Sequence, residues 1–189
     1  MRKIVIFASG SGSNAERIIL HFNKKSIAKV VGVFANNPNA KVLEKAKKYN
    51  VPIFVFSNEE LIAGKVADLV NKIKPDLIVL AGFLLKFPET IINQYPNKII
   101  NIHPALLPKY GGKGMYGKNV HQAVLNSMDK ETGITIHYVN EQYDEGEFIF
   151  QQKISIEDCN SVEEIASKVQ ELEHVHFTRI IEKLITHNS

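Results

Sequence analysis

The sequence contains a single cysteine, Cys159, among 189 residues. One thiol can build neither a disulfide framework nor a cysteine-rich zinc site within a chain, and such a composition is typical of a reducing compartment. A long apolar segment is also lacking at the N-terminus, because the run at residues 4–7 is too short for a signal-peptide core or a membrane span. We therefore expect a cytoplasmic protein that does not enter a membrane.

An excess of one charge is also lacking. The chain has 23 Lys and Arg against 20 Asp and Glu, a formal net charge of +3, spread along its length. This mild basicity suits attraction of small anions and argues against nucleic acid as a partner, which would favour a dense basic stripe. Apolar residues make up 44% of the chain, and neither an internal repeat nor a linker is visible, so we expect one domain over residues 1–189.

The first hundred residues alternate between two kinds of segment. Short β-branched runs, typical of strands buried on both faces, occupy residues 4–8, 30–35, 53–56, 77–81 and 99–102. Helical spacing appears at 14–24 and 41–49, and a capping box at Ser57 and Glu60 opens a helix expected to reach residue 73. This order predicts the α/β class with a doubly wound, mostly parallel sheet.

After Gly133 the pattern changes to apolar and polar residues in alternation. Residues 134–139 and 148–156 are expected to form an antiparallel C-terminal strand pair. A second capping box, at Ser161 and Glu164, is followed by an apolar stripe that ends near Leu184. The sequence thus predicts a long closing helix.

A glycine-rich loop joins the first strand to the first helix. Residues 10–15, GSGSNA, match the dinucleotide pattern G-x-G-x-x-G/A, but the acidic residue that should hold a ribose is missing at 35–38, ANNP. A single phosphate held by Gly12, Ser13 and Asn14 is therefore the better interpretation. A helix cap by Ser13 or Asn14 would use the same N–H groups, and we expect it as well.

Asn101 and His103 lie two residues apart at the end of a predicted parallel strand, where open α/β sheets place ligands. Strand geometry directs both side chains to one face, and Pro104 stiffens the exit. Asp144, on a later connection, is the best candidate to orient the imidazole. The alternatives are a buried polar pair and an ordinary turn aspartate. No serine or cysteine stands beside a base, so we infer direct transfer without a covalent intermediate.

The remaining histidines do not form a metal site. His174 and His176 are two apart on a helix and face different directions, and the others have no partner at ligand spacing. His137 lies in an alternating strand, where it could either support the site or pack within the sheet. We expect no metal.

Four stretches together resemble the phosphoribosylglycinamide formyltransferase family of purine synthesis: GSGSN at 10–14, LAGF at 80–83, NIHPALLP at 101–108 and DEG at 144–146. The resemblance runs from residue 3 to about 185. It implies a Rossmann-like fold and 10-formyltetrahydrofolate as formyl donor, with no metal. The proline-rich segment is shared by several enzymes that use this donor, and the glycine loop indicates the acceptor, glycinamide ribonucleotide.

Carried over position by position, the resemblance implies three groups of site residues. The catalytic set is Asn101, His103 and Asp144. The acceptor would be bound by the glycine loop and the last helix, through Gly12, Ser13, Asn14, Gln170 and Glu173. The folate would be bound by two segments and the catalytic strand, through Leu84, Leu85, Lys86, Phe87, Asn101, Asn140, Glu141, Gln142, Tyr143 and Asp144.

The chemistry implied is attack of the acceptor amine on the formyl carbonyl. Asn101 and protonated His103 would stabilise the oxyanion, and Asp144 would favour the imidazolium and position a water that passes the proton to the departing folate nitrogen. The chain departs from the family pattern at Ala105, where serine is common, and at Leu85, where some members carry arginine. Its segment 111–121, GGKGMYGKNVH, is longer and richer in glycine than usual and is either a mobile cover or a surface excursion.

Other functions stay open at this point. A related enzyme could formylate another acceptor, such as the aminoacyl group of initiator tRNA, or hydrolyse the donor as a deformylase. The lack of an added nucleic-acid or regulatory domain in 189 residues argues against both. A non-enzymatic phosphate-ligand-binding module is the third alternative. The expected assembly is a monomer or a homodimer.

Overall fold

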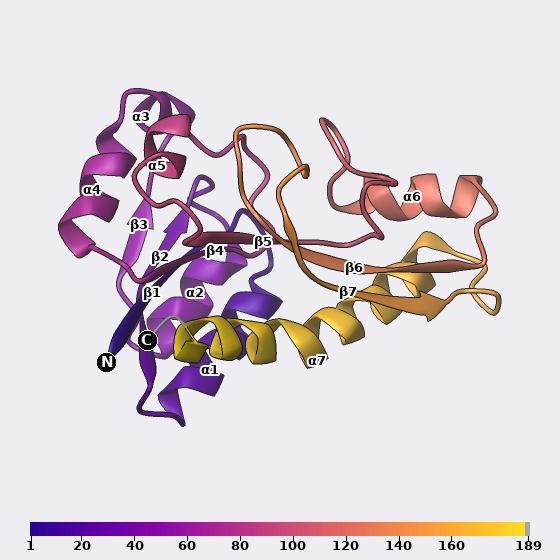
Figure 1. Cartoon of the computed structure of the whole chain (residues 1–189), viewed down its shortest axis with the longest axis horizontal. Helices are drawn as coiled ribbons and strands as arrows, with labels where there is room; N and C mark the ends of the chain where they lie inside the picture. The colour runs from indigo at the N-terminus through magenta and orange to yellow at the C-terminus, as the bar shows by residue number, and fades with distance from the viewer. Residues whose placement is uncertain (188–189) are drawn as a thin grey trace.

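The computed structural model describes residues 1–187, and its strands form one seven-stranded sheet (Figure 1). The strand order is β3-β2-β1-β4-β5-β6-β7. The first five strands are mutually parallel, whereas β6 is antiparallel to both β5 and β7. Their bounds are β1 Arg2–Phe7, β2 Ala28–Ala35, β3 Ile53–Val55, β4 Leu77–Leu80, β5 Ile99–His103, β6 Glu131–Tyr138 and β7 Phe148–Ser155.

Helices cover the two faces of this sheet (Figure 1). The contacts of α1 Ser13–Asn23 with α2 Lys41–Lys48 and with α7 Val162–His187 place these three on one face. The other face carries α3 Asn58–Ile62, α4 Lys65–Ile73 and α5 Glu89–Ile92. Near the far end of the sheet, α6 Lys118–Asn126 packs against α7.

The side chains of β1 alternate between the two faces of the sheet and are apolar on both, which explains why helices cover both faces. Ile4 and Ile6 belong to the core beneath α1, α2 and α7, whereas Val5 and Phe7 belong to the core beneath α3, α4 and α5. All four side chains are fully buried. Residues that alternate along a strand point to opposite faces, so an unbroken apolar run fits a strand buried on both sides.

The order of the strands also decides where a ligand can bind. After β1 the chain adds β2 and β3 on one side, then crosses to place β4 and β5 on the other side of β1. After β1 the chain turns to the face that carries α1, and after β4 it turns to the face that carries α5, so a crevice opens at the carboxyl ends of these two strands. The glycine loop follows β1 at this crevice.

The predicted α/β class, the antiparallel end of the sheet and the long last helix are confirmed, with local corrections. The helix expected over 57–73 is two helices, because the chain breaks at Gly64, which has a φ of 83°. The capping box at Ser57 forms as predicted. In the second box Ser161 accepts from the Glu164 N–H, but the Glu164 carboxylate binds the Asn160 N–H.

Candidate active site

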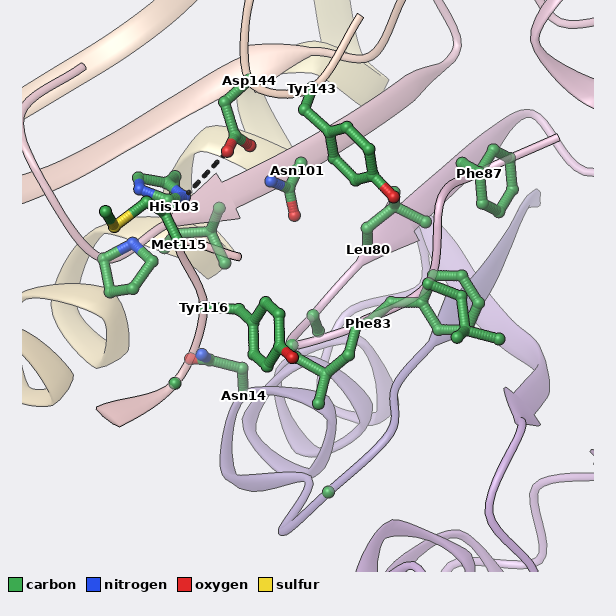
Figure 2. Close-up of a pocket in the computed structure, with 18 of the residues that line it drawn as sticks. Asn14, Leu80, Phe83, Phe87, Asn101, His103, Met115, Tyr116, Tyr143 and Asp144 are labelled. Atoms are coloured by element: carbon green, nitrogen blue, oxygen red, sulfur yellow. Dashed lines mark ion pairs between the residues drawn. The ribbon is translucent and has the colours of Figure 1, made fainter. Parts of the chain in front are cut away.

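One pocket of about 840 Å³ opens at the carboxyl ends of β1, β4 and β5. The glycine loop, the chain after β4, the end of β5, segment 112–118, residues 139–144 and α7 all contribute to its wall. Every residue predicted for the site lies along it. In Figure 2, Asn101, His103 and Asp144 lie together at one side of the pocket, with Phe83 and Asn14 further away.

The glycine loop leaves the start of α1 uncapped by any side chain. The N-cap residue is Gly12, with a φ of 70°, and the predicted cap by Ser13 or Asn14 is wrong. Backbone crowding explains the glycine, since a Cβ there would lie 2.5 Å from the Cβ of Val42. Gly12, Ser13 and Asn14 line the pocket, and the unpaired backbone N–H groups at the start of a helix can bind an anion.

Two side chains of α7 contact the glycine loop. Asn14 Nδ2 donates to Glu173 Oε2 at 2.7 Å, and Gln170 Nε2 donates to Ser13 Oγ at 3.3 Å. Desolvation raises the pKa of Glu173 to about 7, although the hydrogen bond from Asn14 acts in the opposite direction. This part of the pocket therefore holds a carboxyl group that changes its charge near neutral pH.

Asn36 lies where a dinucleotide-binding fold would have an acidic residue, and its side chain is hydrogen-bonded to Ser9. Ser9 Oγ donates to Asn36 Oδ1 at 2.6 Å and accepts from the Leu84 N–H at 3.0 Å. Asn36 thus helps to connect the end of β1 with the chain after β4.

Asn101 is oriented by its neighbour on β6. The register pairs Asn101 with His137, whose Nε2 lies 3.2 Å from Asn101 Nδ2. The other ring nitrogen, Nδ1, lies 2.8 Å from the Tyr138 carbonyl oxygen, which can only accept, so the proton of a neutral ring is on Nδ1. Nε2 then accepts from the amide, and one N–H of Asn101 stays free for a ligand.

His103 is held between two acceptors. Its Nε2 donates to the Tyr110 carbonyl oxygen at 2.7 Å, and its Nδ1 lies 3.5 Å from Asp144 Oδ2. A neutral ring with the proton on Nε2 would turn a lone pair toward a carboxylate, so the carboxylate favours the imidazolium. Burial is nevertheless the largest influence and lowers the pKa of His103.

Asp144 connects both histidines with the segment that follows Tyr110. Its Oδ2 also accepts from the Gly112 N–H at 3.0 Å, and its Oδ1 lies 3.6 Å from His137 Nε2. Burial by itself raises the pKa of Asp144, but the contact with His137, the charge of a protonated His103 and the Gly112 N–H outweigh it, so that the pKa is lowered. The carboxylate is therefore kept ionised in a site where its side chain is only 13% exposed.

Sequence reasoning did not identify the residue that secures the turn after β5. Thr135 Oγ1 donates to the Ala105 carbonyl at 2.7 Å and accepts from the Leu107 N–H at 3.0 Å. It also accepts from Gln151 Nε2 at 2.9 Å. Thr135 lies opposite His103 in the register of β5 and β6. Because this pairing of strands cannot be read from local sequence, the role of Thr135 could not be predicted.

The predicted folate-side residues line the opposite part of the pocket. Leu84 and Tyr143 are 44% and 40% exposed, whereas Phe87 is buried among aromatic rings that include Phe83. Lys86 at the rim forms an ion pair with Glu89 at 3.1 Å. This part of the pocket combines apolar side chains at residues 84–87 with the exposed ring of Tyr143 and polar residues at 140–144, a lining that suits a flat heteroaromatic ligand.

Within residues 1–187 no group of three or more His, Cys, Asp or Glu side chains lies close enough to hold a metal ion. His121 lines the pocket with its buried Nδ1 unpartnered among these residues, and burial lowers its pKa. Cys159 lies away from the pocket, and burial raises the pKa of its thiol. None of the described helices has the length and apolarity to cross a membrane.

An open α/β sheet with a glycine loop and a polar cluster at its switch point is the arrangement in which this class of folds binds small ligands and places catalytic groups. Residues 2–181 match the family described as formyl transferase, and the chain belongs to that family.

Relatives of similar length carry one name. Phosphoribosylglycinamide formyltransferase of Bacillus subtilis is 33% identical, with 100% of this chain and 97% of the relative covered. The Haemophilus influenzae protein of the same name is 34% identical, with 96% and 86% covered. A chloroplastic relative from Arabidopsis thaliana is 35% identical over 95% of this chain, which spans only 64% of that protein.

Solved structures agree with the sequence comparison. The crystal structure of phosphoribosylglycinamide formyltransferase from Bacillus halodurans superimposes with a TM-score of 0.89 at 31% identity, covering 100% of this chain and 97% of that one. Glycinamide ribonucleotide transformylase 1 from Geobacillus kaustophilus gives 0.89 at 31% identity, covering 98% and 99%.

Proposed function

We propose that this enzyme transfers the formyl group of 10-formyltetrahydrofolate to the amine of glycinamide ribonucleotide, a step of purine biosynthesis. One observation carries the proposal: one pocket joins a glycine loop at the start of α1, a polar cluster of Asn101, His103 and Asp144, and a wall formed by residues 84–87 and 140–144 with the exposed ring of Tyr143. The two substrates would enter from opposite ends and meet at the polar cluster. The proposed compartment is the cytoplasm, and the proposed assembly is a monomer or a homodimer.

The acceptor would bind with its phosphate at the start of α1, held by backbone N–H groups of Gly12, Ser13 and Asn14. Gln170 and Glu173, which already contact this loop from α7, would face the ribose and the glycinamide arm. The Glu173 carboxylate would attract the acceptor ammonium and orient its nitrogen. The amine must lose its proton before it attacks.

The donor would bind along the wall formed by residues 84–87 and 140–144. Its flat ring system suits the space between residues 84–87 and residues 140–144, where backbone groups and side chains such as Tyr143 line the pocket. This placement brings the formyl carbon near Asn101. The polar cluster would then act through hydrogen bonds and charge.

Attack of the amine forms a carbon–nitrogen bond and turns the formyl oxygen into an oxyanion. The free N–H of Asn101 and the Nδ1–H of the His103 imidazolium would donate to it. The proton released by the attacking nitrogen passes through a water held by Asp144 to N10 of the folate. Cleavage of the bond from carbon to N10 releases tetrahydrofolate and leaves the formylated acceptor.

The test is to mix the purified enzyme with both substrates and to follow tetrahydrofolate release. His103→Ala and Asp144→Asn are expected to lower kcat by roughly 10²–10³ fold with smaller changes in KM, since each removes transition-state stabilisation. His187→Ala, which removes an exposed imidazole outside the pocket, is the matched control. Near-normal kcat in either site variant contradicts the assigned roles.

Two control reactions separate the alternatives. Release of tetrahydrofolate without the ribonucleotide indicates a deformylase. Formylation of charged initiator tRNA indicates the translation enzyme. Binding of both substrates without any turnover indicates a ligand-binding module, and each of these results would replace the proposed function.

A further inference from the structure

Segment 111–117, GGKGMYG, is a part of the pocket wall to which the reaction assigns no role. Lys113, Gly114, Met115 and Tyr116 all line the pocket. Tyr116 is 47% exposed, so its ring is accessible to a ligand in the pocket. Figure 2 shows its ring directed into the pocket, on the side where Asn14 of the glycine loop lies and away from Asp144.

The backbone of this segment is organised to present that ring. Gly112, Gly114 and Gly117 have φ values of 95°, 88° and 55°, a region that other residues rarely adopt. The Tyr116 N–H donates to the Gly114 carbonyl at 3.2 Å, and Asn119 Nδ2 donates to the same carbonyl at 3.0 Å. The turn therefore has internal hydrogen bonds of its own and holds Tyr116 at its outer edge.

Contacts at the two ends place the segment across the pocket. At one end the Gly112 N–H donates to Asp144, and at the other Lys118 forms an ion pair with Glu163 of α7 at 3.0 Å. The same helix carries Gln170, which contacts the glycine loop. The segment that carries Tyr116 is thus connected to the polar cluster at one end and to α7 at the other.

The phenol group of Tyr116 lacks a hydrogen-bond partner within residues 1–187. By contrast, Tyr95 and Tyr110 use their hydroxyl groups in hydrogen bonds to neighbouring side chains. A phenol O–H is a good donor to a phosphate oxygen, and such a charge-assisted bond is about twice as strong as a neutral one. Lys113 adds a cation to the same segment.

We propose that Tyr116 is a substrate-binding residue whose phenol O–H donates to the acceptor phosphate bound at the start of α1. This inference deepens the proposed function and rests on it. The hydroxyl would complete a phosphate site that the helix N-terminus forms from the other side. It would also make the enzyme discriminate between a phosphorylated acceptor and the same acceptor without phosphate.

The experiment compares two acceptors, glycinamide ribonucleotide and the glycinamide ribonucleoside that lacks the phosphate. Tyr116→Phe keeps the ring and removes only the hydroxyl. It should raise KM for the ribonucleotide by roughly 10- to 100-fold, the effect of losing a hydrogen bond to a charged group, and leave KM for the ribonucleoside within about twofold. An equal change for both acceptors, or no change for either, overturns the proposal.

Tyr143→Phe is the matched control, because it removes the other exposed phenol of the pocket, on the folate side. It should leave the ratio of the two acceptor KM values unchanged. If it alters this ratio as strongly as Tyr116→Phe does, the assignment to Tyr116 is wrong.

A binding measurement decides the question without turnover. Titration calorimetry with ribose 5-phosphate should give weaker binding to Tyr116→Phe than to the parent enzyme, and equal affinities refute the role of the hydroxyl. Absence of formyl transfer by the parent enzyme would refute the proposed function instead. The two failures are therefore distinguishable.

Discussion

Replacing Glu173 by glutamine should make the protein more stable at alkaline pH and weaken its binding of the acceptor. Desolvation raises the pKa of Glu173 from 4.5 to about 7. Its carboxyl group is therefore protonated in the folded chain at pH values where it is ionised in the unfolded chain. Glutamine has the same shape, stays neutral and keeps an oxygen that can accept from Asn14.

The direction of the pH effect on the free energy of unfolding follows from the number of protons that Glu173 binds in the native and unfolded states. Between pH 4.5 and about 7 the native state binds more protons at Glu173 than the unfolded state does, so its contribution to stability falls as pH rises. The contribution is fully present below pH 4.5 and fully lost above about 7. The difference between 4.5 and about 7 corresponds to about 3 kcal/mol. Since the side chain is partly exposed, we expect a gain of about 1–3 kcal/mol.

Urea unfolding at pH 5 and pH 8.5 measures this difference. Glu173→Gln should have a free energy of unfolding close to that of the parent at pH 5 and higher than the parent at pH 8.5. Glu171→Gln, an exposed change two residues earlier on α7, is the control and should shift neither value. A variant that is no more stable than the parent at pH 8.5 would refute the reasoning about desolvation.

The same substitution should reduce function. Without the carboxylate, the acceptor ammonium loses its partner, and KM for glycinamide ribonucleotide should rise by roughly tenfold, while KM for the folate changes little. A gain in stability with a loss of acceptor binding is typical of a residue kept for function. Unchanged acceptor KM would contradict the proposed role of Glu173, whatever its effect on stability.

Two other predictions address the polar cluster and the glycine loop. Asp144→Asn removes the negative charge that raises the pKa of His103, so the alkaline limb of its residual kcat–pH profile should move to lower pH; a limb that stays or moves upward contradicts the pairing. Gly12→Ala should lower the free energy of unfolding by about 2–4 kcal/mol in urea, because its Cβ meets Val42 at a positive φ. Gly10→Ala, which meets nothing within 4 Å, should change it by less than about 0.5 kcal/mol, and equal effects of the two would be contrary evidence.

Local patterns were enough to predict most of the sheet. Buried β-branched runs and helical spacing depend on neighbouring residues, so β1, β2, β4 and β5 could be placed within one or two residues. Short elements were missed. Helix α5 has four residues, too few for a helical period to show, and the start of α6 lies within a glycine-rich segment that was interpreted as a loop.

Only part of the polar cluster could be predicted from local sequence patterns. Asn101 and His103 follow from the spacing of a strand, which directs residues two apart to one face. The role of His137 depends on its pairing with Asn101 across β5 and β6, which is a matter of register between strands far apart in the sequence. Sequence reasoning could not choose between support of the site and packing in the sheet.

By itself, the sequence determined the α/β order of elements, the uncharged phosphate loop and the residue types available for chemistry, because these depend on short-range spacing. Only the tertiary structure decided which groups meet. The amide of Asn14 donates to Glu173, and His103 lies between the Tyr110 carbonyl and Asp144. The ring of Tyr116 is directed into the pocket. Those contacts join residues that are far apart along the chain, and they alone set desolvation, tautomer and pKa.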